Sequence, residues 1–351
     1  MIGFSIFLGE DPSPSTYDYM KRMKAANFKG IFTSLHIPED DSSQYLKRIH
    51  ALGQKAKELE LALMVDISAK ALEAIGVKIE EDVSTLKEMG ITGIRMDYGI
   101  SMATIAAVSK VMTVGLNAST LTPEEVSELE SHQADFSQME LWHNYYPRPE
   151  TGLAKESFVE RNKWLQSQGL KVIAFVPGDE RLRGPLFEHL PTLEKHRQLS
   201  PLAGALELIR ECQVDEVYIG DERLSQTTMT QFNRYFQDQV VSIQVMPLTP
   251  HYHSLFVGCH TNRVDDARDV VRSQEARFKE LPQIKQESCL KREKGSVTLD
   301  NQLYGRYMGE LQVTKKELPA DSRVNVVAKV CSAHLDLVDW IQPGQQYEFY
   351  L

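Results

Sequence analysis

Acidic side chains recur at the ends of short apolar runs, and their chemistry is the first functional signal in this chain. The runs are rich in Val, Ile and Phe, as buried parallel strands are. Carboxyl groups that a fold brings together can act as general acid, general base or nucleophile, and a pair of them usually performs glycoside hydrolysis. The candidates for catalysis are Glu10, Asp66, Asp97, Asp179 and Asp221.

Other chemistries fit the sequence less well. A Schiff-base enzyme needs a lysine on a strand, and none is well placed, because Lys70 comes four residues after Asp66. A metal hydrolase needs histidines and carboxylates at ligand spacing. The only HxH pattern, His251 to His253, lies between the two predicted domains. We therefore expect neither a metal nor another cofactor.

Two segments pair arginine with aspartate near a strand end. In GIRMDYG, Arg95 and Asp97 lie on one face of the strand, because successive side chains alternate. Arg95 could then orient Asp97 and hold it ionised, although a buried structural pair explains the same spacing. In VPGDERLRGP, Arg181 and Arg183 follow a strand-breaking Pro-Gly. This loop predicts a clamp for phosphate or carboxylate, with a solvated charged loop as the alternative.

The segment ELWHNYYPRPETG crowds aromatic side chains at one strand end. Aromatic rings at such a position often stack on sugars, but they could equally pack beneath a long loop. His143 is a weaker candidate, because a lone histidine is usually structural. Polar residues at this and other strand ends complete the predicted binding set: His36, Asn117, His143, Asn144, Tyr145 and Arg148.

The elements that must position these residues alternate regularly. Amphipathic, helix-like segments separate eight apolar runs, which begin at Ile2, Lys29, Leu61, Ile91, Thr113, Phe136, Lys171 and Asp215. This alternation predicts an α/β fold, a (β/α)₈ TIM barrel, whose active site forms at the C-terminal ends of the strands. A doubly wound open sheet is the alternative, disfavoured because no glycine-rich nucleotide-binding motif follows the first run.

The pattern changes near Gln237, where strand-like runs replace helical units. We predict a barrel domain over residues 1–236 and a small β-rich domain over 237–351. The formal net charge of −10 and the pI of about 5.6 argue against nucleic acid or an anionic membrane as partner. The short apolar N-terminus and the widely spaced cysteines predict a cytoplasmic protein.

Several strings resemble the 6-phospho-N-acetylmuramidase family, formerly known as uncharacterised "outer surface" proteins. The strings that carry this resemblance cover nearly the whole chain, and the longest of them are highly specific. They are IFTSLHIPEDD, MVDIS, GIRMDYGI, GLNAST, WHNYYPRPETGL, FVPGDERLRGP, LPTLEKHR, VYIGD and YGRYMGELQV. One position departs from the pattern expected of the family, because Glu180 stands after the aspartate of VPGD where a small residue is common.

The resemblance implies a barrel followed by a cyclophilin-like domain. It also implies cleavage of N-acetylmuramic acid 6-phosphate from N-acetylglucosamine, a step in peptidoglycan recycling and amino-sugar metabolism. Arg148, Arg181 and Arg183 are then candidates for the phosphate and the lactyl carboxylate, with Arg263 or Arg306 reaching in from the second domain. By analogy with barrel glycosidases, Asp97 and Asp179 are the expected catalytic pair.

Alternatives remain at this level. Glu10, Asp66 and Asp221 are other possible catalytic groups, and the substrate's acetamido group could act as an internal nucleophile. A non-catalytic sugar-phosphate-binding protein, or a barrel isomerase or lyase acting on a free sugar phosphate, are the competing functions. A homodimer is one option for the oligomeric state, which the sequence leaves open.

Overall fold

The computed structural model describes residues 1–34, 42–68, 72, 78–79, 83–96, 99–276 and 281–351. The chain forms two compact units, residues 1–229 and 230–351. The division falls inside helix α9 (Gln226–Asp238), which also contains the predicted boundary between residues 236 and 237. Among the described residues, no helix has the length and apolar character that crossing a bilayer requires.

The first unit is a closed barrel of eight parallel strands in sequential order. The strands are β1 (Ile2–Ser5), β2 (Gly30–Ser34), β3 (Ala62–Ile67), β4 (Gly93–Met96), β5 (Thr113–Asn117), β6 (Met139–Trp142), β7 (Lys171–Val176) and β8 (Glu216–Ile219). Strand β1 pairs with both β2 and β8, which closes the sheet. The predicted TIM barrel is therefore confirmed.

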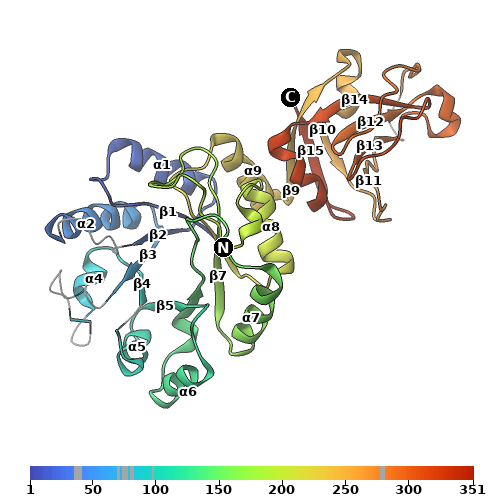
Figure 1. Ribbon diagram of the computed structural model, residues 1–351. Helices are drawn as coiled ribbons and strands as arrows, with labels where there is room; N and C mark the ends of the chain where they lie inside the picture. Colours follow the sequence, from blue (N-terminus) through green and yellow to red (C-terminus); the bar gives the residue numbers. More distant parts are fainter. Residues whose placement is uncertain (35–41, 69–71, 73–77, 80–82, 97–98, 277–280) are drawn as a thin grey trace. The chain divides into compact units, whose positions relative to one another are not determined.

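Helices lie outside the strands (Figure 1). They are α1 (Pro14–Ala25), α2 (Ser42–Glu58), α4 (Ser84–Glu88), α5 (Met102–Ser109), α6 (Pro123–Ser131), α7 (Lys155–Ser167), α8 (Pro201–Glu211) and α9. Local sequence sets several helix starts. Thr122 caps α6 and Glu125 completes a capping box, while Pro123 occupies the first turn, as the sequence predicts.

Aromatic side chains fill the barrel interior. Phe32, Trp142, Phe175 and Tyr218 pack together with Met64 and Ile173, and the aromatic rings of Trp142 and Tyr218 are 4.6 Å apart. Two glycines make room for Tyr218: a Cβ on Gly3 or Gly30 would lie 2.1 Å from its ring or hydroxyl. The barrel is thus a packed core, and only its ends can hold a ligand.

The second unit is a mixed seven-stranded sheet in the order β10-β15-β9-β14-β12-β13-β11. Its strands are β9 (Val240–Pro247), β10 (Gly258–Thr261), β11 (Val270–Arg272), β12 (Ser296–Asp300), β13 (Leu311–Thr314), β14 (Val324–Val330) and β15 (Gln346–Tyr350). Only β9 and β15 pair in parallel; the other pairs are antiparallel. The predicted β-rich domain is confirmed, and its likeness to cyclophilin stays a prediction.

Candidate functional site

Asp66 and Arg95 form a buried ion pair at the C-terminal end of the barrel. Register places Asp66 of β3 opposite Arg95 of β4, and Ser34 of β2 opposite Asp66. Arg95 Nη1 donates to Asp66 Oδ1 at 3.1 Å, and Ser34 Oγ donates to Oδ2 at 3.4 Å. The two charged residues are only 7% and 5% exposed. Because both oxygens of the Asp66 carboxylate accept a hydrogen bond, the carboxylate has a defined orientation.

Arg95 extends this contact across the barrel to the segment after β6. Its Nη2 donates to Asn144 Oδ1 at 2.6 Å, while its Nε has no hydrogen-bond partner among the described residues. Asn144 is held in turn, because Thr192 Oγ1 donates to its carbonyl oxygen at 2.9 Å. A buried donor without a partner is costly. The Nε–H of Arg95 is therefore a buried donor whose partner is not among the described residues.

Tyr145 and Arg183 form the second half of the site. Arg183 Nη1 donates to the Tyr145 hydroxyl at 2.5 Å, and its guanidinium lies 3.9 Å from the centre of the Phe7 ring. Burial raises the pKa of Tyr145, although Arg183 opposes the shift. The phenol therefore stays protonated near neutral pH. The stacked and hydrogen-bonded guanidinium is held in place, and no carboxylate of the described residues neutralises it.

A cleft of about 420 Å³ opens beside Arg183. Its walls come from the loops after β1, β7 and β8 and from the start of α1, and they include Glu10, Ser15, Arg181, Arg183, Gly184, Glu222 and Arg223. Arg181 Nε pairs with Glu222 Oε2 at 2.6 Å. No described carboxylate lies within ion-pair distance of Arg183, and the same holds for Arg223, whose Nη2 contacts Ser15 Oγ at 3.2 Å.

Arg183 and Arg223 line the cleft without a carboxylate partner among the described residues, near the acidic side chains of Glu10 and Asp11. Asp11 is already paired with Lys47 and Arg48. Guanidinium groups in a fixed orientation recognise phosphate through paired N–H donors. The cleft lies beside the last two strands, which is where TIM barrels commonly bind phosphate. The arrangement can therefore hold an anion of phosphate size next to the Tyr145–Arg183 contact.

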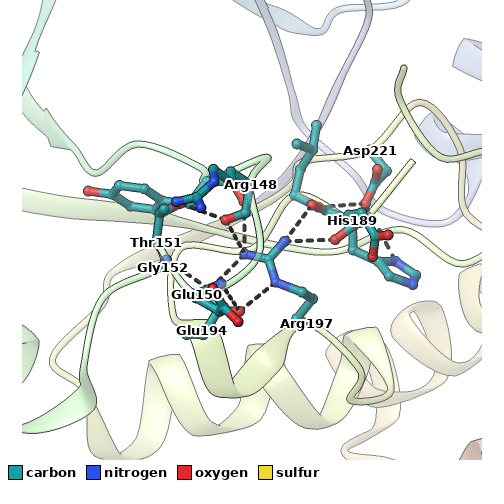
Figure 2. A network of polar contacts seen from close by, with 11 residues as sticks. Arg148, Glu150, Thr151, Gly152, His189, Glu194, Arg197 and Asp221 are labelled. Atoms are coloured by element: carbon teal, nitrogen blue, oxygen red, sulfur yellow. Dashed lines mark hydrogen bonds and ion pairs between the residues drawn. The ribbon is translucent and has the colours of Figure 1, made fainter. Parts of the chain in front are cut away.

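A second arginine–glutamate network ties the loop after β6 to the loop after β7 (Figure 2). Arg197 donates from Nε and Nη2 to both oxygens of Glu194, each at 2.7 Å, and Nη1 donates to the carbonyl of Glu188 at 2.7 Å. Its Nη2 also reaches the carbonyl of Tyr146 at 3.0 Å. The Arg197 guanidinium lowers the pKa of Glu194 to about 2. Arg197 thus joins the loop after β6 to the loop after β7.

Asp221 also has a holding role. Its fully buried carboxylate accepts backbone N–H bonds from Gly178 at 2.9 Å, Arg183 at 3.1 Å and Leu190 at 3.0 Å. These bonds fix both ends of the loop that carries Arg183, as Figure 2 shows for the end at His189. Its oxygens are occupied by the backbone, so the geometry favours a positioning role over a catalytic one.

Asp179, half of the expected catalytic pair, is similarly engaged. Its Oδ1 accepts the Ser225 N–H at 2.7 Å, and its Oδ2 accepts the hydroxyls of Ser225 at 2.8 Å and Thr228 at 2.5 Å. The residue is exposed and stands at the start of α9. These contacts favour a structural role for Asp179, in which it stabilises the start of α9. Glu10, by contrast, is exposed and lines the cleft.

His143 lies outside the barrel interior and contacts helix α7. Its Nε2 lies 2.7 Å from Asn162 Oδ1, and its Nδ1 lies 3.2 Å from Ser119 Oγ. Asn162 Nδ2 donates to the Cys212 carbonyl, so its oxygen must be the acceptor for Nε2–H. Burial lowers the pKa of His143 to about 4. The neutral ring is a structural connector between the loop after β5 and α7.

The remaining predicted residues have varied positions. Asn117 ends β5 and its Oδ1 accepts the Ser119 N–H at 3.0 Å. Arg148 is exposed, and its carbonyl accepts from Arg197 (Figure 2). In the second unit, Arg263 pairs with Asp265 at 2.7 Å and Arg306 donates to Tyr307. His36 and Asp97 lie outside the described residues.

Sequence reasoning missed three contributors. Arg223 follows Asp221 and Glu222 in the DER string after β8, and its charge there is the signal that could have identified it. Phe7 stands two residues after β1, where an aromatic side chain resembles ordinary core. Arg197 lies far from any strand end and gives no local signal.

The site can therefore combine an oriented carboxylate with an anion-binding cleft. Within the described ranges, no cluster of His, Cys, Asp or Glu is arranged to hold a metal ion. The expectation of metal-independent chemistry stays a prediction.

Comparisons with known proteins place this arrangement in a family. A model described as 6-phospho-N-acetylmuramidase, N-terminal, matches residues 2–234, and one described as 6-phospho-N-acetylmuramidase, C-terminal, matches residues 241–350. The search of curated proteins found no match.

Two solved structures are similar over the full chain. A conserved Enterococcus faecalis protein of unknown function is 47% identical with a TM-score of 0.93, and the match covers 100% of this chain and 96% of that one. An uncharacterized B. cereus protein is 25% identical with a TM-score of 0.75, with 100% and 99% of the two chains covered. Because the two family models match nearly every residue, the chain belongs to the 6-phospho-N-acetylmuramidase family.

Proposed function

We propose that this protein hydrolyses the glycosidic bond between N-acetylmuramic acid 6-phosphate and N-acetylglucosamine. The observation that carries the proposal is the position of Arg183, which lines the cleft and also donates to Tyr145 beside the Asp66–Arg95 pair. Burial raises the pKa of Tyr145, and the charge of Asp66 adds to this shift. A phosphate in the cleft would therefore place its sugar near an oriented carboxylate.

Asp66 is the described carboxylate best suited to the reacting centre. Paired with Arg95, it is the anionic member of the site, which suits a nucleophile or a group that orients the substrate's acetamido oxygen for internal attack. The second carboxylate must donate a proton to the leaving oxygen. Asp97, two residues beyond Arg95 in the sequence, is our candidate for that acid.

Arg183 and Arg223 are the proposed phosphate ligands. Both guanidinium groups line the cleft without a carboxylate partner among the described residues, so a dianionic phosphate would gain from both charges. Arg181 contributes less, because Glu222 already neutralises it. The lactyl carboxylate would then pair with the exposed Arg148.

The decisive experiment measures release of N-acetylglucosamine from the muramyl-6-phosphate disaccharide and from its unphosphorylated counterpart. We expect turnover of the phosphorylated substrate alone, lost in Asp66→Asn and Asp97→Asn but retained in Asp179→Asn. A folded wild-type protein that cleaves neither substrate would contradict the proposal. Binding without turnover would then favour a sugar-phosphate-binding protein, and turnover of free sugar phosphate would favour an isomerase or lyase.

A further inference from the structure

The loop between β7 and α8 presents an aromatic side chain to solvent. Phe187 is 61% exposed, and its neighbour Leu186 is 48% exposed. Phe187 also has a φ of 56°, a conformation that bulky L-residues rarely adopt and that glycine or asparagine would adopt more easily. Neither the burial of apolar surface nor backbone preference explains a phenylalanine at this position.

The backbone around Phe187 is held firmly. Its own N–H donates to the Arg183 carbonyl at 3.2 Å. Arg197 Nη1 holds the carbonyls of Glu188 at 2.7 Å and His189 at 3.0 Å, and Asp221 accepts the Leu190 N–H. The exposed ring therefore stands on a backbone fixed from both sides. Strain that the surrounding structure maintains in this way is typical of ligand-binding positions.

The ring also lies close to one residue of the arginine-lined cleft. Gly184 lines the cleft, and a Cβ added to Gly184 would lie 3.0 Å from Phe187 Cζ. The Phe187 ring thus lies beside Gly184, the cleft residue that follows Arg183. A ligand whose anionic group bound Arg183 would extend its attached atoms past this ring.

We infer that Phe187 is a stacking platform for the pyranose ring of a hexosamine 6-phosphate whose phosphate occupies the cleft. The inference rests on the proposed function for the identity of the sugar. The C–H face of a pyranose is apolar, and an aromatic ring recognises it by contact and by exclusion of water. The arginines then bind the phosphate, and Phe187 contacts the sugar to which the phosphate is attached.

The test uses the full-length protein and two probes, inorganic phosphate and N-acetylmuramic acid 6-phosphate, with calorimetric titration of each. Phe187→Gly should bind the sugar phosphate about five- to tenfold more weakly while its affinity for inorganic phosphate is unchanged. Phe187→Trp should retain sugar-phosphate affinity, because it keeps an aromatic face. Leu186→Ala is the matched control for an exposed apolar side chain in the same loop, and we expect wild-type affinity for both probes.

Folding is checked by thermal unfolding. Phe187→Gly should unfold at a temperature no lower than wild type, because glycine relieves the left-handed φ. Equal loss of affinity for both probes, unchanged affinity for both, absence of sugar-phosphate binding by wild type, or a marked fall in unfolding temperature would overturn the inference. Binding requires no turnover, so a wild type that binds the sugar phosphate but hydrolyses nothing refutes the proposed function and leaves the platform standing.

Discussion

Asp66 and Arg95 occupy paired positions on adjacent strands, and their side chains form an ion pair of 3.1 Å that is almost completely buried. Removing one partner of such a pair leaves a buried charge without compensation. The pair also continues through Asn144 to the loop after β6. The catalytic role proposed for Asp66 is therefore coupled to local stability at this point of the barrel.

Asp66→Asn should reduce kcat by about 10²–10⁴-fold. Asparagine preserves the shape of the side chain but not its charge, so the substitution removes the anionic group from the proposed reacting centre. Steady-state kinetics with the phosphorylated disaccharide measures the effect, and circular dichroism checks folding. Asp179→Asn is the control, because its contacts with Ser225 and Thr228 predict a small kinetic change. A larger kinetic effect at Asp179 than at Asp66 would reverse our assignment.

Arg223→Gln should raise KM for the phosphorylated disaccharide by about 10–100-fold, the effect of losing one charged hydrogen bond to phosphate. The same change at Arg181 should have a smaller effect, because Glu222 pairs with that guanidinium at 2.6 Å. Both variants are compared at two salt concentrations. Equal effects of the two substitutions would show that the unpaired charge is not what determines phosphate affinity.

Arg197→Ala should destabilise the protein by about 3 kcal/mol, because it leaves Glu194 without its charged partner and several backbone carbonyls without their donor. Urea unfolding measures the free energy of unfolding. Lys21→Ala is the control, because it removes an exposed ion pair with Asp18. It should change the free energy of unfolding by less than about 0.5 kcal/mol. A stability loss at Arg197 no larger than at Lys21 would exclude the proposed joining of the two loops.

Acid should weaken the Arg197–Glu194 contact in a defined range. The pKa of Glu194 is lowered to about 2 from 4.5, so its contribution is present above pH 4.5 and is lost as pH falls through about 2. The difference in unfolding free energy between wild type and Glu194→Gln should shrink over this range. A difference that stays constant between pH 5 and 2 would contradict the ion-pair description.

His143 should make the protein acid-sensitive at a higher pH. Its pKa in the folded state is about 4, against 6.5 for an ordinary histidine. Between these values the unfolded chain binds more protons, so stability falls as pH drops from 6.5 to 4, by about 3 kcal/mol in total. His143→Gln should flatten this slope. An unchanged slope would mean that another group causes the acid sensitivity.

Glu140 should have the opposite effect on the pH dependence of stability, in an overlapping pH range. Burial and the neighbouring Glu216 raise the pKa of Glu140 to about 6 from 4.5. The folded state then holds the proton more tightly, and stability falls as pH rises through about 6. Glu140→Gln should remove this loss, so its stability gain over wild type should be larger at pH 8 than at pH 4. A gain independent of pH would exclude titration of Glu140 as the cause.

The amino-acid sequence by itself determined the barrel and the separate β-rich unit. Strand and helix periodicities are local properties, and the capping box at Thr122 and Glu125 depends only on neighbouring residues. The sequence also predicted which side chains follow the strand ends, where the active sites of such barrels form. Arg183 and Asp66 are examples, since each stands in or just after an apolar run.

Tertiary structure alone decided what each of these side chains contacts. Asp66, Asp179 and Asp221 look alike in sequence, yet one pairs with Arg95, one holds the start of α9 and one binds three backbone N–H groups. Those partners come from distant segments, and only closure of the barrel brings them within hydrogen-bond distance. Phe187 illustrates the same limit: a left-handed φ and an exposed ring depend on loop geometry that Arg197 and Asp221 impose from elsewhere in the chain.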